Sequence, residues 1–318
     1  MKVTVIGCGR WGSLIAWYLY KQGHKVALYG RGDSPRMQRL INEGGNEYIS
    51  LPKEVALTTD ITSAADAKVI LISVNSQGLR GLIGELNKVG IKNKVIVLCM
   101  KGLEKETGMR LSEVASAGLD GSNKIAVWLG PGHVQEFYAG IPNCMVIDSA
   151  DDATKRLLVD SFSSSLIRFY YGNDLIGNEI GAAAKNVVGI AAGMLDGLGL
   201  TSLKGALMSR GTREVARLIK AMGGSELSAY GLCHLGDYEA TVFSEFSHNR
   251  RFGEFFVLKK PFDSLAEGYY TVKAIIKLGE RFGVELPICG VVYKALYEDA
   301  DVRAELDRLF ERTIKNEF

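Results

Sequence analysis

The sequence predicts an α/β fold in which a doubly wound, mostly parallel sheet is followed by an all-helical domain. Three observations predict this class. Short β-branched runs alternate with helical patterns in the first half of the chain, a glycine-rich motif joins the first run to the first helical pattern, and strand-like runs stop near residue 175. We therefore expect two domains, residues 1–176 with the sheet and residues 177–318 with helices.

Six short apolar runs bounded by turn residues predict buried strands, at residues 3–6, 25–29, 68–74, 94–99, 125–128 and 144–147. Apolar residues at helical spacing predict helices between them, over 11–22, 77–88 and 109–116. This alternation is typical of parallel strands joined by crossover helices. In the second half the same spacing predicts helices over 176–196, 205–222, 266–282 and 303–315.

Gly7, Gly9 and Gly12 form the pattern G-x-G-x-x-G directly after the first predicted strand. In such a motif the first glycine permits a tight turn, the second lets a pyrophosphate approach the backbone, and the third lets helix and strand pack closely. Because strand, loop, helix and second strand follow within about 30 residues, the motif predicts a dinucleotide-binding Rossmann domain. A merely tight turn between strand and helix is the alternative.

The residues just after the second predicted strand distinguish between the two nicotinamide dinucleotides. NAD sites usually place an acidic residue there to bind the ribose hydroxyls, whereas this chain has Arg31. A guanidinium suits the 2′-phosphate of NADP(H), with Arg36 in support, so we favour NADP(H) as the cofactor. The alternative is NAD(H), bound through Asp33 while Arg31 lies in solvent.

Composition excludes several other classes. The chain has 318 residues, 47% of them hydrophobic, and a formal net charge of +2, so it can bury a large core and has no charge surplus for broad binding of nucleic acid or anionic membranes. Five scattered cysteines without a CxxC pair disfavour disulfides and structural zinc. We expect a cytoplasmic protein with no metal site and no integral membrane segment.

Lys185 is the only ionisable residue in the apolar helical run 180–195. Glycines at positions 181, 189 and 193 predict a thin helix that lets a substrate approach the lysine. A buried ammonium needs a partner or loses its proton, and partial desolvation lowers its pKa from about 10.4 toward values useful in proton transfer. The alternative is a structural lysine that reaches solvent or pairs with Glu179 or Asp237.

Three further segments carry groups that bind anions. Lys101 follows the predicted strand 94–99, Gly130 and Gly132 follow the strand 125–128, and residues 247–253 concentrate hydrogen-bond donors and positive charge. Loops at the carboxyl ends of parallel strands form the ligand crevice of an open sheet, and a basic segment can clamp a phosphate or carboxylate. Basic loops are also common in solvent, so composition alone leaves the clamp a hypothesis.

Together these segments resemble the NAD(P)-dependent glycerol-3-phosphate dehydrogenase family of the bacterial type. The resemblance covers nearly the whole chain and is carried by residues 7–12, 101–104, 130–131, 179–197, 235–237, 249–253, 267–269 and 282–287. It implies a helical C-terminal domain of the 6-phosphogluconate-dehydrogenase-like type. It also implies an oxidoreductase that reversibly reduces dihydroxyacetone phosphate, a small phosphate substrate, to sn-glycerol 3-phosphate for phospholipid biosynthesis.

The resemblance implies roles for individual residues. Lys185 is the proton donor and acceptor, and Asp237 accompanies it in the catalytic set. The implied substrate-binding positions are Lys101, Gly130, Gly132, Asn186, Ser247, His248, Asn249 and Arg250. The implied cofactor-binding positions are Gly7, Gly9, Arg10, Trp11, Gly12, Arg31, Val134 and Glu267.

Three residues near the reacting end depart from the family's pattern. His248 stands where the family has an arginine, Gly132 where it has a hydroxyl residue, and Asn75 where it has a proline. An imidazole that titrates near neutrality replaces a permanent, bidentate cation at position 248. Arg250 and Arg251 are the candidates to bind the anion instead.

These departures leave two alternatives to dihydroxyacetone phosphate reduction. The first is the same Lys185 chemistry on a different small keto-phosphate, phosphonate or keto-acid. The second is a noncatalytic protein that binds NADPH and regulates a partner, against which the intact Lys185 and Asp237 argue. Apolar residues on the C-terminal helices permit a homodimer without requiring one.

Overall fold

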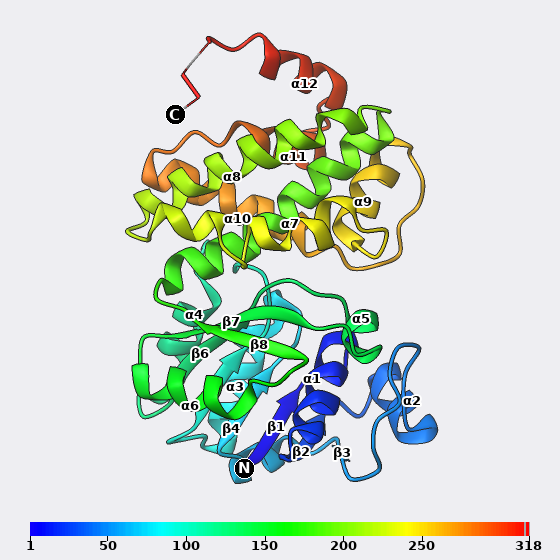
Figure 1. The fold of residues 1–318 in the computed structure, drawn as a ribbon, viewed down its shortest axis with the longest axis vertical. Helices are drawn as coiled ribbons and strands as arrows, with labels where there is room; N and C mark the ends of the chain where they lie inside the picture. The colour runs from blue at the N-terminus through cyan, green and yellow to red at the C-terminus, as the bar shows by residue number, and fades with distance from the viewer. Residues whose placement is uncertain (315, 318) are drawn as a thin grey trace.

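The computed structural model describes residues 1–314 and 316–317. Its N-terminal part is an eight-stranded sheet in the order β3-β2-β1-β4-β5-β6-β7-β8 (Figure 1). The strands are β1 (Lys2–Ile6), β2 (Lys25–Tyr29), β3 (Ala56–Thr58), β4 (Val69–Ile72), β5 (Val95–Leu98), β6 (Lys124–Leu129), β7 (Asn143–Ser149) and β8 (Ile167–Tyr171). Neighbouring strands are parallel except β6 and β7, so β7 and β8 run opposite to the other six.

Helices cover both faces of this sheet. Apolar side chains of α1 (Arg10–Lys21), α2 (Pro35–Glu43), α5 (Val134–Tyr138) and α6 (Asp152–Phe162) form one core with the strands. Those of α3 (Leu79–Val89) and α4 (Leu111–Gly118) form a second core on the opposite face. The central strands β4 and β5 are buried along their whole length, which explains their unbroken runs of aliphatic residues.

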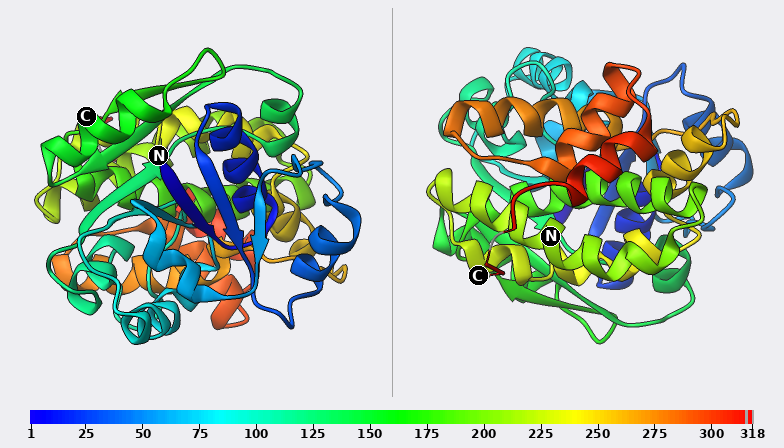
Figure 2. Two further views of the ribbon diagram at one scale, coloured as in Figure 1. Left: turned by 90° about the horizontal axis from the view of Figure 1, so that it is seen from below. Right: turned by 90° about the horizontal axis from the view of Figure 1, so that it is seen from above.

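The C-terminal part is a helical domain built around α7 (Leu175–Gly197) (Figure 1). The other helices are α8 (Lys204–Ala221), α9 (His248–Val257), α10 (Glu267–Phe282), α11 (Pro287–Tyr297) and α12 (Val302–Phe310). Asp174 caps α7 by accepting a hydrogen bond from the Gly177 amide. Because α7 contacts β6 and β7 as well as α8 to α11, it joins the sheet to the helical layer. These form the two ends of the molecule in Figure 1, and Figure 2 views the molecule from the sheet end on the left and from the helical end on the right.

The glycines of α7 serve helix packing and do not give a substrate access. A side chain at Gly193 would overlap the Arg250 carbonyl, and one at Gly253 would overlap the Ile190 carbonyl. The backbones of α7 and α9 therefore cross in direct contact, which only residues without a Cβ allow. Gly189 likewise lies against Thr241 and Asn249. The expectation that these glycines open the helix to a substrate is wrong, because the chain itself fills that space.

The predicted fold class is confirmed, and most predicted elements match within one to three residues. The short strand β3 and the edge strand β8 were not expected; β8 alternates buried and exposed residues. The last predicted helix, 303–315, ends at Phe310, and Lys315 lies outside the described residues. The domain division after residue 176 falls in the first turn of α7 and stays a prediction. None of the described helices combines the length and hydropathy needed to cross a bilayer.

Candidate active site

The glycine motif links β1 to α1 with room for a phosphate. Gly7 has a φ of +120°, and a side chain there would overlap the Ser73 carbonyl. A side chain at Gly12 would overlap the Gly7 carbonyl, so both positions need glycine. By contrast, a Cβ on Gly9 would lie 3.7 Å from its nearest neighbour, the Arg36 guanidinium. This open backbone at the N-terminus of α1, beside a cation, fits the pyrophosphate of a dinucleotide.

Two exposed arginines follow β2, where the adenosine ribose of a dinucleotide lies in this fold. Neither Arg31 nor Arg36 forms an ion pair with a carboxylate in residues 1–314 and 316–317. Asp33 is exposed as well. The loop therefore presents two unpaired guanidiniums and one carboxylate to a ligand.

The charged centre of the site is formed by three side chains from three elements. The Lys185 ammonium on α7 lies 3.0 Å from Asp237 Oδ2 and donates a 2.8 Å hydrogen bond to Thr241 Oγ1. Lys101, after β5, reaches the same oxygen of Asp237 at 2.7 Å and the Gly130 carbonyl at 2.5 Å. The structure thus brings together four residues expected at the site and adds Thr241, which the sequence patterns did not indicate.

This centre holds two ammonium groups against one carboxylate. Burial lowers the pKa of Lys185 to about 8; the negative charge of Asp237 opposes this shift and the positive charge of Lys101 adds to it. The second carboxylate oxygen of Asp237, Oδ1, is buried and has no hydrogen-bond partner among the described residues. A proton donor titrating near neutrality and an unused acceptor lie side by side, which suits proton transfer to a ligand.

Two asparagines connect the helices to this centre. Asn186 donates to the Lys101 carbonyl at 2.8 Å and accepts from Asn249 at 3.1 Å. Asn249 in turn accepts from the Gly268 amide at 2.9 Å. Each side-chain NH₂ keeps one N–H for a ligand. The chain of amides fixes α9 and α10 against Lys101, so both asparagines position the site as well as lining it.

Glu267 closes the site from the first turn of α10. Its carboxylate accepts a 2.6 Å hydrogen bond from Ser76 Oγ, and burial raises its pKa. Asn75, beside it, has φ −60° and ψ 135°, and its side chain accepts a hydrogen bond from the Gln77 amide. Because proline imposes a φ close to this value, the backbone at position 75 is one that a proline could also adopt.

The loop after β6 explains the departure at Gly132. Its φ is +133°, and a side chain there would overlap the Phe137 ring, so a hydroxyl residue does not fit this conformation. Trp11 packs against the same ring at 6.1 Å, and Val134 is buried beside it. Nε2 of His133 is buried without a hydrogen-bond partner among the described residues. These aromatic and aliphatic groups form a wall next to the glycine motif.

The basic segment at the start of α9 divides into two parts. Ser247 caps the helix, accepting from the Arg250 amide, and His248 faces Arg10, with 3.5 Å between Nε2 and Nη1. Arg250 faces away: its guanidinium bonds Asp196 at 2.5 Å and the Ser244 carbonyl at 3.2 Å. A carboxylate therefore already neutralises Arg250, and its role in substrate binding stays a prediction.

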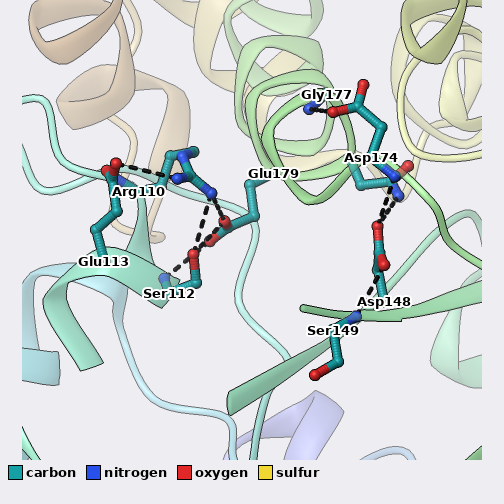
Figure 3. Close-up of polar contacts among 9 residues, drawn as sticks. Arg110, Ser112, Glu113, Asp148, Ser149, Asp174, Gly177 and Glu179 are labelled. Carbon is teal, nitrogen blue, oxygen red and sulfur yellow. Dashed lines mark hydrogen bonds and ion pairs between the residues drawn. The ribbon is translucent and has the colours of Figure 1, made fainter. Parts of the chain in front are cut away.

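Glu179, the other partner considered for Lys185, belongs to a separate polar cluster (Figure 3). Its carboxylate accepts hydrogen bonds from Arg110 at 2.8 Å and from both the amide and the hydroxyl of Ser112. Nearby, Asp148 accepts from Asn178 at 2.8 Å. Both carboxylates tie the first turns of α7 to the sheet domain and leave Lys185 to Asp237.

One cavity among the described residues lies apart from the charged centre. This cavity, of about 770 Å³, lies between α8, α11 and α12, and none of the residues of the charged centre lines it. The described residues contain no group of three or more His, Cys, Asp or Glu placed to hold a metal ion. All five cysteines are free thiols.

Comparison with known proteins identifies the family. Models of the NAD-dependent glycerol-3-phosphate dehydrogenase N-terminus and C-terminus match residues 2–155 and 174–307. The chain is 32% identical to the glycerol-3-phosphate dehydrogenase (NAD(P)⁺) of Thermoanaerobacter sp. (strain X514), covering 100% of this chain and 99% of that one. It is 33% identical to that of Prosthecochloris aestuarii (strain DSM 271 / SK 413), over 100% of both.

A solved structure agrees with these relatives. The crystal structure of glycerol-3-phosphate dehydrogenase from Coxiella burnetii superposes with a TM-score of 0.91 at 28% identity, covering 98% of this chain and 99% of that one. The glycine loop, the buried Lys185 and Asp237 pair and the two-part fold thus occur in a chain that matches its relatives end to end. The resemblance seen in the sequence is confirmed: this protein belongs to the NAD(P)-dependent glycerol-3-phosphate dehydrogenase family of the bacterial type.

Proposed function

We propose that this protein catalyses the reversible NAD(P)H-dependent reduction of dihydroxyacetone phosphate to sn-glycerol 3-phosphate, and so supplies glycerophospholipid synthesis. The observation that carries the proposal is the buried Lys185 ammonium, held by Asp237 and Thr241 in a chain of this family. Its pKa of about 8 suits both donation and acceptance of a proton near neutral pH.

Lys185 is the proposed proton donor for the ketone. When bound, the reduced nicotinamide supplies a hydride to the carbonyl carbon. Lys185 donates a hydrogen bond to the carbonyl oxygen, stabilises the negative charge that develops there, and transfers its proton to complete the hydroxyl. Asp237 orients the ammonium at 3.0 Å, and Lys101 shares that carboxylate at 2.7 Å. In the oxidation of glycerol 3-phosphate the neutral amine takes the proton back.

The remaining site residues are proposed for binding. For the substrate we propose Lys101, Gly130, Asn186, Ser247, His248 and Asn249, together with the backbone at Gly132. For the cofactor we propose Gly7, Gly9, Trp11, Gly12, Arg31, Val134 and Glu267. The contacts between Asn186, Asn249 and Lys101 support the first set, and the open backbone at Gly9 supports the second.

NADP(H) is the proposed preferred cofactor. The support is the pair of exposed arginines after β2, which have no carboxylate partner in the described part of the chain and suit a 2′-phosphate. Arg31→Asp should lower kcat/KM for NADPH by about 10-fold or more and leave that for NADH unchanged or higher. An unchanged ratio would assign the adenosine end to Asp33 and NAD(H).

A second candidate function rests on His248. Because the residue at this position is not a permanent cation, a different small keto-phosphate, phosphonate or keto-acid is the alternative substrate for the same Lys185 chemistry. Oxidation of NADPH, followed by absorbance with a panel of these ketones, separates the two. A kcat/KM for dihydroxyacetone phosphate far below that for another ketone would rule out dihydroxyacetone phosphate as the substrate but would leave the proposed proton transfer by Lys185 in place. No turnover with any ketone, with NADPH still bound, would favour a noncatalytic regulator.

The cytoplasmic location and the homodimer stay proposals. The free thiols of all five cysteines are compatible with a reducing compartment. Fractionation of cells and light scattering of the purified protein test the two directly.

A further inference from the structure

His248 is an imidazole and not a permanent cation, which raises the question of what binds the substrate's phosphate. A phosphate monoester carries up to two negative charges, and arginine binds it best because its planar fork matches two phosphate oxygens. Three arginines lie close enough to His248, in the chain or in space, to bind it: Arg250, Arg251 and Arg10. Their contacts distinguish them.

Arg250 and Arg251 have other contacts. Arg250 is partly buried and pairs with Asp196 at 2.5 Å and with Glu254 at 3.5 Å. Asp196 also pairs with Lys204 at 2.7 Å, so moving Arg250 would break up a buried ion-pair network. Arg251 is exposed and its guanidinium lies over the Phe255 ring, 5.7 Å from its centroid. Neither contact directs the side chain toward His248.

Arg10 contacts His248 directly. Its Nη1 lies 3.5 Å from His248 Nε2, across the boundary between the two domains. Its guanidinium also lies over the Tyr48 ring, 5.6 Å from the centroid. No carboxylate in the described residues pairs with it. Arg10 is therefore a half-buried guanidinium, held in place by an imidazole and a phenol, whose charge is not balanced.

The positive charge of Arg10 acts on two histidines of the site, His248 and His133. Burial lowers the pKa of His248, and the nearby charges of Arg10, Arg251 and Arg36 lower it further. Burial also lowers the pKa of His133; the charges of Glu136 and Asp237 oppose this shift, and those of Lys185 and Arg10 add to it. His133 thus lies within the field of both cations. A neutral His248 accepts a hydrogen bond through Nε2 from Arg10, which orients the guanidinium.

We infer that Arg10, from the glycine motif, binds the phosphate of the substrate, and that His248 at the start of α9 positions it. The inference rests on the proposed function, since it names the group that recognises that substrate's phosphate. It reassigns Arg10 from the cofactor to the substrate. It also explains why an imidazole is tolerated at position 248: a second guanidinium 3.5 Å from the first would repel it.

Substitution of Arg10 and His248, singly and together, tests the inference. Arg10→Ser should raise KM for dihydroxyacetone phosphate about 10- to 100-fold, the range expected for losing a charge-assisted bidentate contact. His248→Arg alone should also raise it, through repulsion. The double variant Arg10→Ser with His248→Arg should recover most of the loss, so the two changes are strongly non-additive.

Three measurements identify what Arg10 contacts. Calorimetric titration of glycerol 3-phosphate into the NADP⁺-bound protein reads the phosphate contact without turnover, and Arg10→Ser should weaken it by the same factor. Unphosphorylated dihydroxyacetone should be reduced equally by the wild type and Arg10→Ser. Arg251→Ser, which removes an exposed guanidinium from the same turn of α9, is the matched control and should leave KM for dihydroxyacetone phosphate unchanged.

The outcomes separate this inference from the proposed function. If the wild-type protein does not reduce dihydroxyacetone phosphate, the proposed function fails. The inference is then tested by glycerol 3-phosphate binding alone: weaker binding by a folded Arg10→Ser protein supports it, and unaltered binding rejects it. If the wild type is active, an unchanged KM in Arg10→Ser overturns the inference. So does a change of equal size in the Kd of NADPH with no change for the substrate, because Arg10 would then bind the cofactor's pyrophosphate.

Discussion

Helix α7 carries two buried ionisable side chains that differ in how completely their partners satisfy them. Glu179, near its start, accepts three hydrogen bonds from Arg110 and Ser112 (Figure 3). Lys185, further along the helix, shares Asp237 Oδ2 with a second ammonium, while Asp237 Oδ1 has no partner among the described residues. Burial shifts the pKa of both toward the neutral form.

The difference shows that burial and a shifted pKa do not by themselves indicate catalysis. Both are present at Glu179, where the hydrogen bonds join α7 to the sheet domain. What distinguishes the Lys185 region is unused bonding capacity: two ammonium groups share one carboxylate, and one oxygen of that carboxylate has no donor within the described part of the chain. Substitutions in the two regions should therefore have opposite effects on turnover and stability.

The largest expected effect is on turnover in Lys185→Ala. Loss of the proton donor should lower kcat by about 10²- to 10⁴-fold, while NADPH binding measured by fluorescence stays within a factor of about two. The free energy of unfolding should change much less than kcat, because removing a buried ammonium also removes the cost of its desolvation. A variant that keeps the wild-type rate would reduce Lys185 to a structural residue like Glu179.

Glu179→Ala should show the reverse pattern. It leaves the partly buried Arg110 guanidinium without its main partner, which typically costs about 3 kcal/mol in the free energy of unfolding, measured by urea denaturation. The kcat of the folded fraction should stay near wild type. Glu113→Ala, which removes the exposed partner of the same arginine, is the control and should cost less than about 1 kcal/mol. A rate loss without destabilisation would overturn the assignment.

The pH dependence should follow Lys185. Reduction needs the ammonium, so kcat/KM for reduction should be level below pH 8 and fall about tenfold per unit above its pKa of about 8; oxidation needs the amine and should rise over the same range. Because the positive charge of Lys101 depresses this pKa, Lys101→Met should move the inflection to higher pH. Glu179→Gln should not move it. An unmoved inflection in Lys101→Met would mean that another group controls the profile.

Local patterns predicted the fold and the cofactor loop because both depend on short segments. The glycine motif, the aliphatic runs of β4 and β5 and the long apolar helix each carry their signal within a few turns. The edge strand β8 was missed because its exposed face keeps it from forming an apolar run. Its opposite direction relative to β1 depends on pairing with β7, which no local pattern encodes.

Contacts between residues distant in sequence are the part of the site that local patterns could not predict. Asp196, which neutralises Arg250, lies 54 residues away. The choice between Glu179 and Asp237 for Lys185 was open because Arg110, which takes Glu179, comes from the sheet domain. Thr241 carried no signal in the sequence, since a single threonine within Glu239–Phe243 forms no motif. The contact of Arg10 with His248 spans 238 residues and is visible only once the domains are assembled.

The smallest effect is expected for Asn75→Pro, which tests whether unused bonding capacity distinguishes catalytic residues from structural ones. Asn75 lies beside Ser76 and Glu267 at the site, yet its side-chain oxygen is satisfied by the Gln77 amide, so the criterion assigns it a structural role. Its φ of −60° is the value that proline imposes. Asn75→Pro loses one capping bond of about 1 kcal/mol and regains about 0.4–1 kcal/mol through a less flexible unfolded chain. We therefore expect unfolding free energy and kcat both near wild type, measured by urea denaturation and NADPH oxidation. A tenfold loss of kcat in a stable Asn75→Pro protein would show that a side chain whose hydrogen bonds are already satisfied still acts in the reaction. Unused bonding capacity would then not distinguish catalytic residues from structural ones.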